Sequence, residues 1–174
     1  MLAPVPFVWV SRTQTFPSCS RASSATYSRL SSVGSRSVTV PDDFEPLDTS
    51  AFSERIGPLY ISRRESVPVI GLLVDDHHLN RTGRIHGGLL ATVADIAVSR
   101  AAWDQVPDGA TIATADLHIA YLGNVNAGAW VEAWPSVDRV GRAVVHASCL
   151  VESDGEPLAK VLATVAVRLP AVAP

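Results

Sequence analysis

The sequence predicts an α+β fold in which an antiparallel sheet curls around one long central helix. From Leu89 to Trp103 the chain has no Gly or Pro and is dominated by Ala, Leu and Val, which favours a helix. Its apolar residues surround the helix axis, and a helix that is apolar nearly all round is buried. Four strand-like segments joined by short turns follow, so they should pair antiparallel. A buried helix followed by such strands predicts a sheet wrapped around that helix.

A short helix and two strands are expected before the central helix. Ser50 is placed to cap a helix that ends at Ile56. The segments Leu59 to Glu65 and Pro68 to Val74 then have the composition of strands. Asp75-Asp76-His77-His78 follows and is expected to be a solvated loop, because its residues lack the spacing of a metal site. Alternatively, an acidic residue of this segment helps to hold the following loop, which carries Asn80.

Four strands are expected after the central helix, at Thr111 to Leu122, Gly128 to Val137, Arg142 to Glu152 and Leu158 to Leu169. In the first strand, alternation places Ala115, Leu117, Ile119 and Tyr121 on one face, and Thr114, Asp116 and His118 on the other. In the last two strands, alternate apolar residues from Ala143 to Val151 and from Ala159 to Leu169 point inward. Residues 139–142 and 153–156 are expected as hairpin turns.

Composition fits one globular domain and argues against several function classes. Of the 174 residues, 47% are hydrophobic and 18% are charged, so the chain can bury a sizeable core. A net charge of −3 gives no general attraction to nucleic acid. No run of apolar residues is long enough to predict a membrane span. Cys19 and Cys149 make no disulfide framework, so a reducing compartment is expected.

The N-terminal residues differ from the rest of the chain. Residues 1–44 are expected to be a disordered or targeting-like leader, and residues 45–170 the folded domain, with Pro41 to Pro46 as the linker. Residues 1–40 contain arginines and serines but no Asp or Glu, as an organellar transit peptide does. A disordered leader or a start codon placed too far upstream explains the same composition. The expected location is the cytoplasm, or the mitochondrial matrix if residues 1–40 are a cleaved transit peptide.

One polar line interrupts the apolar helix. Thr92, Asp95 and Ser99 are spaced three and four residues apart, so they share a face. A buried carboxylate is costly unless it is paired, hydrogen-bonded or used, although the line also fits a solvated edge of the helix. At the helix start, Gly87 and Gly88 would let a ligand oxygen approach backbone N–H groups that have no helical partner. Loop and helix together thus predict an oxyanion site and a carboxylate, about two turns apart.

These residues resemble a known family. Asn80, the triplet His86-Gly87-Gly88 and Asp95, followed by the segment Thr114 to Leu122, have the spacing of the hot-dog-fold acyl-CoA thioesterases. The resemblance is to the branch of the phenylacetate-pathway and THEM2-like enzymes, and it covers roughly residues 45–169. It implies the hot-dog fold, in which two subunits pair strand to strand.

The resemblance also implies roles for five residues. The Gly87 N–H would stabilise the oxyanion, and Asp95 of the partner chain would act on the thioester carbonyl carbon, as a general base or as a nucleophile. Thr114 would position the water, and Asn80 would orient the thioester or bridge a water. His86 is expected to shape the turn rather than to shuttle protons. The predicted function is therefore hydrolysis of an acyl- or aryl-acyl-CoA to the free acid and CoA.

The expected partners follow from that substrate. Arg142 and Arg139, which flank a hairpin glycine, and Arg84, beside the oxyanion loop, are the candidates for binding the CoA phosphates. No metal and no separate cofactor are expected, since CoA is part of the substrate. A homodimer or homotetramer with active sites at the subunit interface is expected. The chain departs from many relatives at Gly123-Asn124, where they carry a basic residue and Pro, so the resemblance does not extend to the details of the substrate entrance.

Two other functions fit the same fold. A non-catalytic acyl-CoA-binding or sensing domain would bind thioesters without turnover, but no DNA-binding segment that would suit a regulator is visible. A hot-dog hydratase or dehydratase would need a different Asp-His arrangement near its helix, which the sequence lacks.

Overall fold

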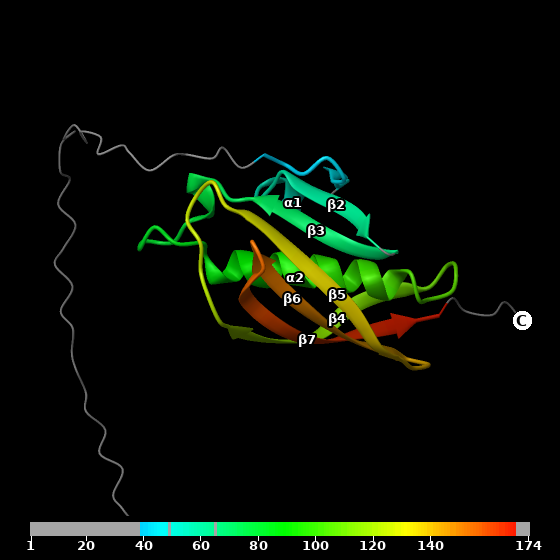
Figure 1. Ribbon diagram of the computed structural model, residues 1–174. Helices are drawn as coiled ribbons and strands as arrows, with labels where there is room; N and C mark the ends of the chain where they lie inside the picture. Colours follow the sequence, from blue (N-terminus) through cyan, green and yellow to red (C-terminus); the bar gives the residue numbers. More distant parts are fainter. Residues whose placement is uncertain (1–38, 49, 65, 170–174) are drawn as a thin grey trace, which may run out of the picture. The chain divides into compact units, whose positions relative to one another are not determined.

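The computed structural model describes residues 39–48, 50–64 and 66–169, which form one long helix and a seven-stranded sheet (Figure 1). Most of the expected leader, residues 1–38, lies outside the described residues, as do Glu65 and position 170. The elements in chain order are β1 (Glu45–Pro46), α1 (Ala51–Glu54), β2 (Leu59–Arg64), β3 (Val67–Leu73), the 3-10 helix η1 (Asp76–His78), α2 (Gly87–Trp103), β4 (Thr111–Tyr121), β5 (Trp130–Val140), β6 (Val144–Ser153) and β7 (Glu156–Arg168).

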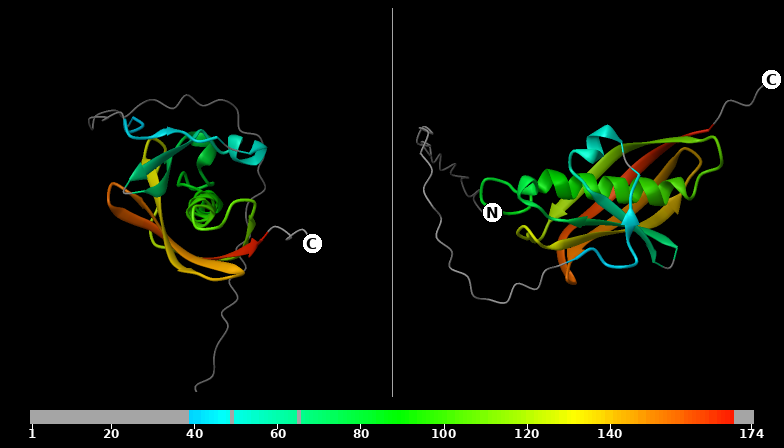
Figure 2. Two further views of the ribbon diagram at one scale, coloured as in Figure 1. Left: turned by 90° about the vertical axis from the view of Figure 1, so that its right-hand side faces the viewer. Right: turned by 90° about the horizontal axis from the view of Figure 1, so that it is seen from above.

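The sheet has the order β1-β2-β3-β5-β6-β7-β4, and all its neighbouring strands are antiparallel. Viewed along the helix, the sheet curls around α2 (Figure 2, left). This is the architecture expected from the sequence, and the predicted α+β hot-dog fold is confirmed. Among the described strands, β4 pairs only with β7, so the other edge of β4 carries no strand of this chain.

Apolar residues on every side but one explain why α2 lies inside the sheet. Val93, Ala94, Ala97 and Val98 are fully buried, and they belong to the main core together with residues from β2, β3, β5, β6 and β7. The alanines allow the strands to lie close to the helix axis. The expected polar line of Thr92, Asp95 and Ser99 is only half-buried, so it marks the side of α2 that the sheet leaves open.

The expected faces of the strand now seen as β4 were wrong in one respect. The pairing of β4 with β7 shifts register between Thr114 and Asp116, so Ala115 forms a β-bulge. A bulge reverses the alternation of side chains along a strand. Thr114 consequently points toward α2, on the same side as Leu117 and Ile119 rather than opposite to them.

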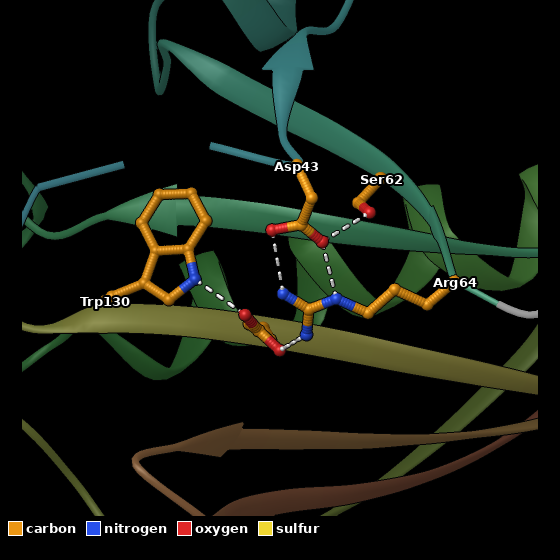
Figure 3. A network of polar contacts seen from close by, with 5 residues as sticks. Asp43, Ser62, Arg64 and Trp130 are labelled. Atoms are coloured by element: carbon orange, nitrogen blue, oxygen red, sulfur yellow. Dashed lines mark hydrogen bonds and ion pairs between the residues drawn. The ribbon is translucent and has the colours of Figure 1, made fainter. Parts of the chain in front are cut away.

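The residues expected as a linker, Pro41 to Pro46, instead pack on the outer face of the sheet. Phe44 is buried and packs edge-on against Trp130, with ring centroids 5.0 Å apart. The Asp43 carboxylate accepts hydrogen bonds from Ser62 and Arg64, and Arg64 in turn pairs with Glu132 (Figure 3). These contacts make residues 41–46 part of the fold.

The other expected elements are close to those observed. The turn at residues 153–156 is confirmed, and Asp154 and Gly155 have the positive φ angles of 51° and 79° that a tight hairpin requires. Ser50 occupies the N-cap position of α1, but its side chain makes no capping hydrogen bond, and α1 ends at Glu54 rather than Ile56. Ala143, expected to point inward, is exposed in the turn before β6. None of the described helices has the length and hydropathy needed to span a membrane.

Candidate functional site

The first turn of α2 leaves one backbone donor unused. An α-helix has four N-terminal N–H groups without helical acceptors. Here the Gly88 N–H donates to His86 Nδ1 at 3.0 Å, and the N–H groups of Leu89 and Leu90 donate to the His86 carbonyl oxygen at 2.9 and 3.3 Å. Within the described residues, the Gly87 N–H has no acceptor. The helix dipole is positive at this end, so this N–H suits a negatively charged oxygen.

The peptide group between Gly87 and Gly88 is held at both ends. Its N–H is the one bonded to His86, and its carbonyl oxygen accepts a 3.0 Å hydrogen bond from the Tyr121 hydroxyl at the end of β4. A Cβ atom added to Gly87 would lie 3.1 Å from the Tyr121 ring. The sequence reasoning missed this use of Tyr121, because nothing in the local pattern shows what the end of a strand contacts.

His86 and Asn80 shape the loop before the helix. His86 is the N-cap of α2, and its own N–H donates to the His78 carbonyl oxygen at 2.9 Å. Asn80 Oδ1 accepts hydrogen bonds from the backbone N–H and hydroxyl of Thr82, at 2.8 and 2.6 Å, and from the Arg84 N–H at 3.3 Å. Gly83 closes this turn with a φ of 75°. His86 directly precedes the free Gly87 N–H, whereas the observed contacts of Asn80 are with Thr82 and Arg84 in the loop before it.

Asp95 is held by β4. The Thr114 hydroxyl donates a 2.6 Å hydrogen bond to Asp95 Oδ1, and Ser99 Oγ lies 3.3 Å from Thr114 Oγ1. Thr114 thus meets the polar line of its own chain, whereas the sequence reasoning expected it on the opposite face of the strand. Within the part of the chain that the structure describes, no cation pairs with Asp95, so the second carboxylate oxygen can accept a proton or a hydrogen bond.

The predicted site residues Asp95 and His86 line two separate hollows. A hollow of about 460 Å³ is lined by Asp95, Ser99 and Arg100, with apolar walls from Leu47, Ile96, Trp103 and Ile112. A second hollow of about 360 Å³ lies at the helix start and is lined by residues that include His86, Gly88 and Leu89. Asp95 follows Gly87 by eight residues, a separation of about 12 Å along the helix axis. One chain therefore does not bring its carboxylate and its free N–H to the same hollow.

His78 is a structural residue that the sequence reasoning missed, since residues 75–78 were expected to be solvated. It is buried, its Nδ1 accepts from the Asp75 N–H at 2.9 Å, and its Nε2 lies 2.9 Å from the Ile56 carbonyl oxygen. Burial, reinforced by His77, lowers the pKa of His78 below its ordinary value. Asp75 caps η1, so this acid does support the start of the loop that carries Asn80. No group of three potential metal ligands is found in the described part of the chain.

The three predicted phosphate-binding arginines are not brought together. Arg84 lies in the loop before α2, where its guanidinium donates to Asn126 Oδ1 at 2.9 Å. Arg139 and Arg142 are exposed at the β5–β6 hairpin. Val145, just beyond that hairpin, packs with Ala102 near the end of α2, so the hairpin lies at the opposite end of the helix from Gly87.

Comparison with known proteins adds a family to this geometry. Residues 82–160, which include Gly87, Asp95 and Thr114, match the family described as the thioesterase superfamily. A Pseudomonas aeruginosa protein named putative esterase PA0474 is 32% identical over 124 residues, which cover 70% of this chain and 91% of that protein.

Solved structures show the same fold. A variant of the phenylacetic acid degradation protein PaaI from Thermus thermophilus is 27% identical, with a TM-score of 0.60 over 67% of this chain and 98% of that chain. The BH2602 protein from Bacillus halodurans, solved with CoA, is 26% identical, with a TM-score of 0.57 over 62% of this chain and 71% of that chain.

Proposed function

Because this chain belongs to the thioesterase superfamily and has the hot-dog fold, we propose that it hydrolyses the thioester of an acyl- or aryl-acyl-CoA to the free acid and CoA. The observation that carries the proposal is the Asp95 carboxylate, held by Thr114 at 2.6 Å on the open side of an otherwise apolar helix. The free Gly87 N–H at the start of the same helix supports it.

Thioester hydrolysis places negative charge on the carbonyl oxygen during attack. The Gly87 N–H stabilises that charge, with the positive end of the helix dipole behind it. Asp95 acts on the carbonyl carbon in one of two ways. It takes a proton from water, whose oxygen then attacks the carbon, or it attacks the carbon itself and forms an anhydride that water later opens. In both routes the C–S bond breaks and CoA leaves as the thiol.

Thr114, Asn80 and His86 support these two groups. The Thr114 hydroxyl donates its hydrogen bond to Asp95 Oδ1, which orients the carboxylate, and Ser99 lies 3.3 Å from the Thr114 oxygen, which has a second lone pair that can accept from the water. The side-chain oxygen Oδ1 of Asn80 accepts hydrogen bonds from the loop. Its side-chain NH₂ is the group left to orient the thioester or a water. His86 holds the Gly88 N–H and shapes the turn.

The active site is shared between two subunits. About 12 Å along the helix axis separates Gly87 from Asp95 within one chain, which is too far for one thioester carbonyl to reach both. The unpaired edge of β4 offers a surface on which a second copy adds its own β4. Each site then combines Gly87 of one subunit with Asp95 of the partner subunit. A homodimer, or a tetramer built from such dimers, is the assembly that this function requires.

The CoA portion binds through its phosphates. BH2602, a relative of similar fold, was solved with CoA. Arg142 and Arg139 at the exposed hairpin are the proposed phosphate ligands, and Arg84 near the oxyanion loop is the third candidate. We propose no metal and no further cofactor, since water and the protein groups complete the reaction.

Thiol release tests the proposal. The protein is incubated with short-chain, medium-chain and aryl-acyl-CoAs, and free CoA is measured with a thiol reagent. Asp95→Asn should lower kcat at least about 100-fold while substrate still binds. Asp108→Asn is the matched control, because Asp108 is an exposed acid in the turn between α2 and β4. Binding of every acyl-CoA in the panel without turnover by the unmodified protein would favour a sensing domain instead.

A further inference from the structure

We propose that Tyr121 is a positioning residue for the oxyanion-binding N–H of Gly87, an inference that rests on the proposed thioesterase function. The Tyr121 hydroxyl donates a 3.0 Å hydrogen bond to the Gly87 carbonyl oxygen. Tyr121 itself is 52% exposed, so burial of its ring does not account for where the side chain lies. The side chain ends on the one residue of the first helical turn whose N–H is free.

Two hydrogen bonds restrain the peptide group after Gly87. Tyr121 donates to its oxygen at 3.0 Å, and His86 Nδ1 accepts from its N–H at 3.0 Å, so both restrict how the plane between Gly87 and Gly88 can tilt. The Gly87 Cα joins this plane to the preceding one, which carries the Gly87 N–H. Fixing one plane restricts the direction of the other. Preorganised donors of this kind are effective because they need no reorganisation when charge develops.

The ring of Tyr121 adds a second constraint. Ring carbons Cε1 and Cζ lie 3.1 Å from the position that a Cβ of Gly87 would take. The aromatic edge therefore packs against the Gly87 backbone, closer than most side chains at this position would lie without a small shift of the ring. The hydroxyl and the ring of Tyr121 therefore both contact the backbone of Gly87.

One strand, β4, contacts both the oxyanion donor Gly87, through Tyr121, and the carboxylate Asp95, through Thr114. Tyr121 ends β4, and Thr114, which holds Asp95, lies on the same strand seven residues earlier. β4 is held by a ladder of ten residue pairs with β7. One rigid strand thus sets both the carboxylate of its own chain and the oxyanion donor of its own chain, although the two serve different sites of the dimer.

The variant Tyr121→Phe removes the hydroxyl and keeps the ring. We expect kcat to fall about 10-fold or more with KM changed less than about twofold, because a misplaced catalytic group affects the transition state more than binding. Tyr60→Phe is the matched control, since Tyr60 is half-buried on the outer side of the sheet against Trp130. Circular dichroism and thermal melting check that both variants are folded.

Two CoA analogues separate positioning from a general structural role. A trifluoromethyl ketone analogue mimics the oxyanion, and a thioether analogue resembles the substrate without a carbonyl. Tyr121→Phe should weaken binding of the ketone by about the same factor as kcat and leave binding of the thioether unchanged. An unchanged kcat, or equal losses for both analogues, would overturn the inference while the proposed function stands. Wild-type protein that releases no thiol would overturn the proposed function, and this inference with it.

Discussion

The Thr114 hydroxyl donates to Asp95 Oδ1 at 2.6 Å, which joins the edge strand β4 to the central helix at a single carboxylate. The contact exists because the bulge at Ala115 turns Thr114 toward α2. A charge-assisted hydrogen bond of this length fixes the orientation of the carboxylate. In the proposed reaction, that orientation decides which carboxylate oxygen faces the thioester.

Replacing Thr114 tests this role. Thr114→Val keeps the shape of the side chain and removes the hydroxyl, so kcat should fall about 10-fold or more because Asp95 is no longer held. Thr114→Ser keeps the hydroxyl and should retain most of the activity. Steady-state kinetics on one acyl-CoA measures both variants. A loss in the Ser variant as large as that in the Val variant would show that the hydroxyl alone does not hold Asp95, and would contradict this role.

Gly87→Pro removes the proposed oxyanion donor and leaves the helix in place. Gly87 is the first residue of α2, a position where Pro is well tolerated. The preceding residue, His86, has φ −73° and ψ 129°, the extended conformation that a following proline requires. We expect kcat to fall about 100- to 1,000-fold, as for the loss of one oxyanion donor.

Circular dichroism of Gly87→Pro provides the control, since its helix signal should match that of the wild type. The Cβ atom of the proline would lie 3.1 Å from the Tyr121 ring, so this partly exposed side chain has to shift by a few tenths of an ångström. Activity within a few-fold of wild type, with an intact helix, would show that this N–H takes no part.

Asp43 should make stability depend on acid pH. Its hydrogen bonds from Arg64 and then Ser62 lower the pKa of Asp43 to about 2, against about 3.9 in an unfolded chain. A lowered pKa contributes stability above the unfolded value, and the contribution is lost as pH falls toward the folded value. The difference in free energy of unfolding between wild type and Asp43→Asn should therefore shrink between pH 4 and pH 2, as measured by urea titration. A difference that stays constant over this range would contradict the ion pair between Asp43 and Arg64.

His78 should weaken the fold at mildly acidic pH. Burial and the adjacent His77, whose ring lies 3.8 Å away, lower the pKa of His78, while Asp75 opposes that shift. As pH falls, His78 is protonated in the unfolded chain before it is protonated in the folded protein. The contribution of His78 to the free energy of unfolding is therefore full above about pH 6.5 and declines as pH falls below it. His78→Gln should reduce this dependence. Melting temperatures between pH 7.5 and 5 measure the effect, and identical slopes for the wild type and the variant would contradict it.

Local patterns predicted most of the fold. The apolar residues of α2 and the alternation in β6 and β7 are properties of neighbouring residues, and the structure confirms both elements. The turn at Asp154-Gly155 was predictable for the same reason.

Long-range contacts explain what the sequence could not show. The bulge that redirects Thr114 depends on the pairing of β4 with β7, about 50 residues apart in the chain. Residues 41–46 pack on the sheet because Phe44 and Trp130 cover Gly71, where any Cβ would lie 2.3 Å from the Trp130 ring. Tyr121 reaches the helix start only because the sheet is curled. Each of these contacts involves residues that are far apart in the sequence.

Subunit complementation tests the shared active site most directly. Asp95→Asn and Gly87→Pro proteins, each inactive alone, are mixed under conditions that exchange subunits. If each site takes Gly87 from one subunit and Asp95 from the partner subunit, a mixed dimer has one intact site and one site with both defects. Since half of the dimers are then mixed, thiol release should recover to about one quarter of the wild-type rate. No recovery, with mixed dimers demonstrated by mass spectrometry, would contradict the shared site.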